Sequence, residues 1–61
     1  MVKEPDMGEV IVELVRNGPY LKCSAIHVAT GLEASAVGPA AEPKGLERIA
    51  LAKLKRALAA R

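Results

Sequence analysis

Apolar and polar residues alternate along the first half of the chain, which is the pattern of β-strands that bury one face. Residues 9–16, EVIVELVR, are rich in β-branched side chains and predict a strand with Val10, Val12 and Leu14 on one face. A second run of this kind, YLKCSAIH over residues 20–27, predicts the next strand.

The connection between these strands contains Asn17-Gly18, a strong signal for a β-hairpin. The pairs expected across it are Leu14 with Leu21, Val12 with Cys23, Val10 with Ala25 and Glu13 with Lys22. Because Pro19 lacks the N–H that would close a two-residue turn, a wider loop closed by Val15 and Tyr20 is the alternative. That loop keeps the same register.

A second hairpin follows, with a turn at residues 28–31 and a third strand at residues 32–38. Gly31 suits a left-handed position in this turn. The expected pairs are His27 with Leu32, Ala25 with Ala34 and Cys23 with Ala36. Both hairpins select the same apolar face, which favours a β-meander.

The spacing of apolar residues becomes helical over residues 45–60. The apolar stripe consists of Leu46, Ile49, Ala50, Leu54, Ala57 and Leu58, and Leu51 widens it. We therefore predict an α+β fold of order β-β-β-α, a three-stranded antiparallel meander with one C-terminal helix packed on one face. Residues 1–8 are expected to form a flexible N-terminal tail, and residues 9–61 a single domain.

The predicted core is too small for a comfortable monomer, because the chain has 61 residues and its core face is rich in alanine. Oligomerisation is a usual remedy, so we predict a homodimer. The interface candidates are Ile11, Val15, Ile26, Val37 and Leu51. The first four of these lie on the sheet face opposite the core face. Either two sheets pack on each other through this opposite face, or the helix of each chain covers the sheet of its partner. The short connector with Pro39 and Pro43 makes such a helix swap conceivable.

Three segments together resemble a family of very small bacterial proteins classed as a domain of unknown function. They are GEVIVELV, LKCSAIHVATGLEASAVGPA and LERIALAKL, and the resemblance covers nearly the whole chain after residue 7. Members of that family often carry an acidic residue at the position of His27. The resemblance implies the β-β-β-α fold and no particular activity.

The segment VGPAAEPKGLERIA, residues 37–50, has the order of a phosphate-binding loop, with Gly38 and Lys44 in the right places. However, Pro43 replaces the second glycine and Gly45 replaces the magnesium-binding hydroxyl residue. We therefore predict no nucleotide site, and at most a weak anion site at the helix N-terminus beside Lys44.

The sequence gives little support for a catalytic site or a metal site. Cys23 is the only cysteine and is predicted to lie in the core, so a disulfide within the chain is excluded. His27 has no carboxylate or nucleophile near it in sequence, and Glu13 and Glu33 lie on separate edge strands of the predicted sheet. We predict no enzyme activity, no metal and no cofactor. A free thiol, an N-terminus without a signal-peptide core and the lack of a membrane-spanning apolar run favour the cytoplasm.

Charge is divided unequally along the chain. Residues 1–43 hold three basic and six acidic side chains, whereas residues 44–61 hold six basic and one acidic. The basic residues are Lys44, Arg48, Lys53, Lys55, Arg56 and Arg61. The main prediction is a small, non-enzymatic homodimer that serves as an interaction or accessory module with an unknown protein partner. The alternative is weak, non-specific binding of nucleic acid through the basic helix.

Overall fold

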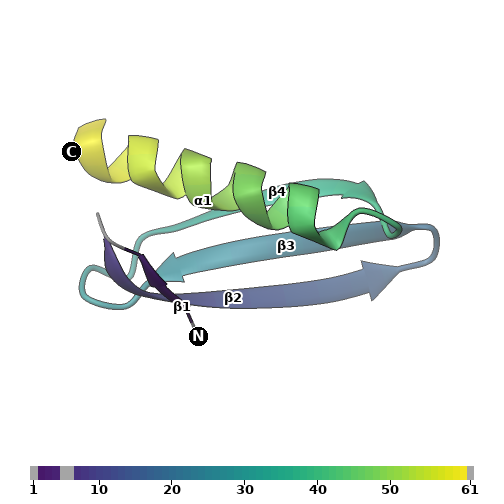
Figure 1. Ribbon diagram of the computed structural model, residues 1–61, viewed down its shortest axis with the longest axis horizontal. Coiled ribbons are helices and arrows are strands. Elements are labelled where there is room, and N and C mark those ends of the chain that lie inside the picture. Colours follow the sequence, from purple (N-terminus) through teal and green to yellow (C-terminus); the bar gives the residue numbers. More distant parts are fainter. Residues whose placement is uncertain (1, 5–6, 61) are drawn as a thin grey trace.

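A computed structural model describes residues 2–4 and 7–60 as four strands followed by one helix (Figure 1). The elements are β1 (Val2–Glu4), β2 (Gly8–Asn17), β3 (Tyr20–His27), β4 (Glu33–Pro39) and α1 (Pro43–Ala60). All neighbouring strands are antiparallel, in the order β1-β2-β3-β4. The predicted α+β class, with a meander of β2, β3 and β4 and a C-terminal helix on one face, is confirmed.

Strand β1 corrects the prediction of a flexible tail over residues 1–8. Val2–Glu4 pair with the first residues of β2, so that Val2 lies opposite Val10. Gly8 makes this reversal possible, because its φ of 78° is readily reached only without a side chain. Residues 1, 5 and 6 of the predicted tail lie outside the described residues.

The predicted register of the first hairpin is wrong by two residues. Asn17 pairs with Tyr20, and Gly18-Pro19 forms the centre of the turn. Gly18 has a φ of 62°, and proline fixes its own φ near −65°, a combination typical of a type II′ turn. In this position Pro19 needs no N–H for the sheet, which removes the conflict that the Asn-Gly turn would have created.

A shift of two residues keeps every side chain on its predicted face but changes its partner. Val10 lies opposite His27, Val12 opposite Ala25, Leu14 opposite Cys23, Glu13 opposite Ser24, and Val15 opposite Lys22. The predicted Glu13–Lys22 pair therefore does not form.

The second hairpin has the predicted register. Ala25 lies opposite Ala34, and Cys23 opposite Ala36. The His27 amide donates to the Leu32 carbonyl over 2.7 Å, and Gly31 has the expected positive φ of 77°.

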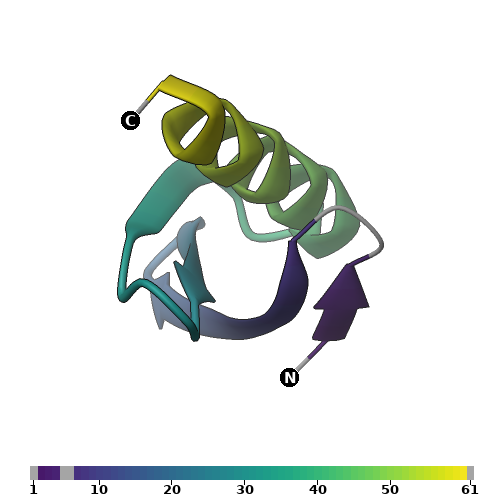
Figure 2. The ribbon, with the colours of Figure 1, turned by 90° about the vertical axis from the view of Figure 1, so that its left-hand side faces the viewer.

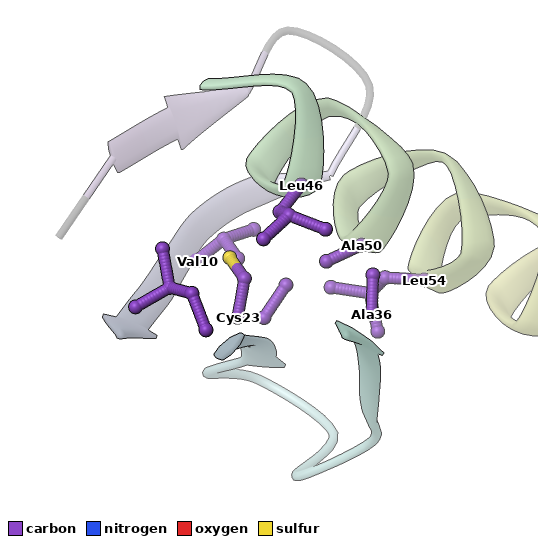
Figure 3. Packing of buried hydrophobic residues seen from close by; sticks show 8 residues of the cluster. Val10, Cys23, Ala36, Leu46, Ala50 and Leu54 are labelled. Carbon is purple, nitrogen blue, oxygen red and sulfur yellow. The ribbon is translucent and has the colours of Figure 1, made fainter. Parts of the chain in front are cut away.

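Helix α1 begins at Pro43, two residues earlier than predicted, since proline is well suited to the first position of a helix. The helix crosses the concave side of the curved sheet and contacts β3 and β4 (Figures 1 and 2). The buried cluster consists of Val10, Leu21, Cys23, Ala25, Ala36, Leu46, Ala50 and Leu54 (Figure 3).

The buried stripe of α1 is narrower than predicted because the helix covers two strands rather than three. Leu46, Ala50 and Leu54 are buried, whereas Ile49 is 49% exposed. Leu14 of β2 was also predicted for the core face, yet it too is 49% exposed.

A close contact between Gly38 and Leu46 fixes the start of the helix on the sheet. A Cβ atom at Gly38 would lie 2.8 Å from Leu46 Cδ2. The connector is held to the first hairpin by the Ala40 amide, which donates to the Pro19 carbonyl over 3.0 Å. The helix thus lies on its own sheet.

Candidate interaction surfaces

The sheet face opposite α1, which we call the outer face, is not covered by the helix. Four of the five predicted interface residues lie there, on three adjacent strands: Ile11, Val15, Ile26 and Val37. Ile11 lies directly opposite Ile26, while Val15 and Val37 flank Lys22 from either side. The exposed fractions of Val15 and Val37 are 62% and 65%, so these side chains have few neighbours within the chain.

Polar side chains separate the two apolar rows of the outer face. Glu13, Ser24 and Ser35 lie side by side across the three strands, between the row of Ile11 and the row of Val15. Such a mixture of apolar and polar groups is typical of surfaces that bind other proteins in water. Exposed Tyr20 also belongs to this face. Its alternation with Lys22 along β3 could have identified it from the sequence.

The fifth interface candidate, Leu51, lies elsewhere. It is on α1, half-buried against the core cluster, and cannot share a surface with the outer face. Leu51 instead lines a shallow depression on the helix together with Lys44, Glu47 and Arg48. The five interface candidates therefore lie on two separate surfaces, and a role of Leu51 in an interface stays a prediction.

The basic residues of α1 are not equivalent. Lys44, Arg48, Lys55 and Arg56 are exposed on the helix. Lys53 is exposed as well, and its Nζ atom donates to the Ser35 carbonyl over 3.0 Å. Glu47 is the only acidic residue within α1, and Arg61 lies outside the described residues.

The segment that resembled a phosphate-binding loop is occupied by the fold itself. The Leu46 side chain fills the space in front of Gly38. The Ala40 and Glu42 amides donate to the carbonyls of Pro19 and Pro39, so they do not point at a ligand. The weak anion site at the helix N-terminus stays a prediction.

Cys23 is fully buried between the sheet and α1. Burial raises the pKa of its thiol above the ordinary value, and the negative charge of Glu47 raises it further. A raised pKa keeps the thiol protonated, and the thiolate is the reactive form. The predicted inert role of Cys23 in the core is consistent with this environment.

His27 connects two turns at the same end of the sheet, a role that its sequence context did not reveal. Its Nε2 atom lies 2.8 Å from the Met7 carbonyl, which can only accept, so Nε2 carries a proton. In the tautomer with its proton on Nε2, Nδ1 accepts from the Thr30 hydroxyl over 2.7 Å. The same hydroxyl oxygen accepts from the Leu32 amide over 3.2 Å. Both ring nitrogens are therefore used in holding the β1–β2 turn against the β3–β4 turn.

Neither a metal site nor a membrane span emerges from residues 2–4 and 7–60. No three His, Cys, Asp or Glu side chains in this part of the chain are grouped so that they could hold an ion. Its helix α1 is not apolar enough to cross a membrane.

Comparison with protein families gives one match. A family model described as a domain of unknown function, DUF6898, matches residues 7–61. Comparisons with curated proteins and with solved structures give no match.

Proposed function

This chain belongs to the family described as a domain of unknown function, DUF6898, and we propose that it is a small non-enzymatic interaction module that works as a homodimer. The outer face of the sheet is the proposed interface. The observation that carries this proposal is the exposure of Val15 and Val37, two valines that flank one lysine on an uncovered sheet.

The composition of the core supports association. Four of the eight buried residues of the cluster are alanine or cysteine, which bury little area each. A second sheet packed on the outer face would remove further apolar area from water and add to the stability of both chains.

A non-enzymatic role is supported by what the reactive side chains do. Cys23 is buried with a protonated thiol, and both nitrogens of His27 bond to the chain itself. A free thiol is ordinary in the reducing cytoplasm, which is the proposed location.

The interface is tested by a charged substitution at Val37. Burying an unpaired carboxylate costs at least about 1.4 kcal/mol, so Val37→Glu is expected to weaken the dimer at least about tenfold. The measurement is the mass in solution, by sedimentation or light scattering, over a range of protein concentrations. Val37 is largely exposed, so the variant is expected to keep its circular dichroism spectrum.

Ile49→Glu is the matched control, because Ile49 is an exposed apolar residue of α1 and lies on the other side of the sheet. It should leave the mass unchanged. A wild-type chain that stays monomeric at tens of micromolar, or equal effects of both substitutions, would contradict the proposed interface.

A second candidate function rests on the charge of α1, where the described residues include five basic side chains and one acidic. Exposed Lys44, Arg48, Lys55 and Arg56 could contact phosphates without reading bases. Four phosphate contacts predict a loss of about a hundredfold in affinity for DNA or RNA between about 50 and 200 mM salt.

Titration of labelled DNA and RNA at these salt concentrations tests this candidate. Arg48→Gln should lower the salt slope by about one contact, whereas Lys22→Gln, which removes a cation from the outer face, should not. Absence of binding at low salt, or binding that is indifferent to salt, excludes it.

A further inference from the structure

The two long edges of the sheet differ in how they are protected. Strand β4 is the last strand of the order β1-β2-β3-β4, and its outer edge faces away from β3. At the other side, β1 pairs only with Gly8, Glu9 and Val10, so the edge of β2 that faces away from β3 has no neighbouring strand beyond Val10 among the described residues (Figure 1).

On β4, the edge is capped from above by the helix. Successive residues of an antiparallel strand direct their backbone groups alternately toward and away from the neighbouring strand. Because the Leu32 carbonyl accepts from the His27 amide, every second residue counted from Leu32 bonds to β3, and the backbone groups of Ser35 point away from β3. Lys53 of α1 donates to the Ser35 carbonyl at the middle of this edge. An inserted lysine of this kind is a common device against pairing between sheets.

On β2, the corresponding groups are open. The Val28 amide donates to the Glu9 carbonyl, so residues 9, 11, 13, 15 and 17 bond to β3. The N–H and C=O groups of Val12, Leu14 and Arg16 therefore point outward, beyond the reach of β1. Leu14 adds an apolar side chain that is 49% exposed at the same edge.

We infer that the open half of the β2 edge, Val12 to Arg16, is a strand-addition site, and that its partner is the same segment of a second copy. An antiparallel pairing centred on Leu14 would place Leu14 opposite Leu14 of the other copy and Val12 opposite its Arg16. All three outward-pointing residues of each strand would then share hydrogen bonds, and no like charges would lie opposite each other. The β4 edge is excluded by Lys53, so the contact closes as a pair rather than growing into a fibre.

This contact is separate from the outer face and does not rest on the proposed function. An edge contact uses backbone groups of β2, whereas the outer face uses side chains of three strands. A chain that forms both contacts would assemble beyond the dimer at high concentration.

Amide hydrogen exchange on the wild-type chain tests the inference directly. The Leu14 amide has no bonding partner among residues 2–4 and 7–60, so it should exchange fast in dilute protein and at least about tenfold slower once copies pair. The amides of Ser35 and Val37 at the capped edge of β4 should not slow with concentration. Equal exchange of the Leu14 amide at all concentrations would overturn the inference.

Leu14→Pro provides a second test, because it removes an N–H that the monomer does not use and edge strands tolerate proline. It should abolish the edge contact, whereas Leu14→Ala keeps the N–H and should retain the slowed exchange of the neighbouring amides of Val12 and Arg16. If Val37→Glu lowers the mass and Leu14→Pro does not, the outer face is right and the edge contact is wrong. The reverse result supports the edge contact and rejects the outer face.

Discussion

Leu54→Ala is expected to lower the free energy of unfolding by about 2–5 kcal/mol, the range for truncating a buried leucine. Leu54 is fully buried, at the centre of α1, and is one of only three buried residues of the helix. The small neighbours Ala36 and Ala50 have no flexible atoms with which to fill the space it would leave. A chain of 61 residues has a total stability of about 3–9 kcal/mol, so this one change removes much of it.

Urea unfolding followed by circular dichroism at fixed protein concentration measures this effect. Leu58→Ala is the matched control, since Leu58 lies one turn further along α1 and is half-buried. It should cost about 1 kcal/mol. Equal losses from the two substitutions would show that Leu54 does not contribute more than Leu58 to the packing of α1 on the sheet.

Gly38→Val is expected to destabilise the chain by about 1–3 kcal/mol through overpacking. Even the first atom of the new side chain would lie 2.8 Å from Leu46 Cδ2, which is too close for carbon atoms. Leu46 belongs to the buried cluster, so either its side chain or the start of α1 has to shift to relieve the contact. Thermal unfolding of the variant and the wild type gives the difference.

A double-mutant cycle with Leu46→Ala identifies the cause. Leu46→Ala alone leaves a cavity, but it creates space for a valine at position 38. The double variant should therefore lose at least about 1 kcal/mol less stability than the sum of the losses in the two single variants. Gly45→Ala is the control, because nothing lies within 4 Å of a Cβ there and alanine favours helix formation. It should stabilise the chain by about 0.5–1 kcal/mol. Additive losses at positions 38 and 46 would contradict the overpacking explanation.

Alternation and helical spacing were sufficient to predict the fold and the two faces of the sheet. They failed on the first register because Asn17-Gly18 and Gly18-Pro19 are both plausible turn centres, and a shift of two residues leaves the faces unchanged. They also missed β1, whose pairing depends on the positive φ of Gly8 rather than on an apolar pattern.

The candidate surface was predictable in part for the same reason. Ile11, Val15, Ile26 and Val37 share a face in any register that keeps the alternation. That Leu51 lies on a different surface from these four depends on the position of α1 over β3 and β4, a tertiary property that periodicity does not contain. The hydrogen bonds of His27 to Met7 and Thr30 join residues from two turns, and no local sequence pattern predicts them.

The position of α1 also has a consequence for the order of folding. Seven of the eight buried cluster residues come from β3, β4 and α1, which follow one another along the chain, and only Val10 comes from β2. Contacts between neighbouring segments form quickly, because little chain has to be closed into a loop. We therefore expect residues 20–60, which supply most of the buried cluster, to form the folding nucleus. On this expectation the β1–β2 hairpin joins the nucleus last, so the edge to which a second copy would add belongs to a less stable part of the fold.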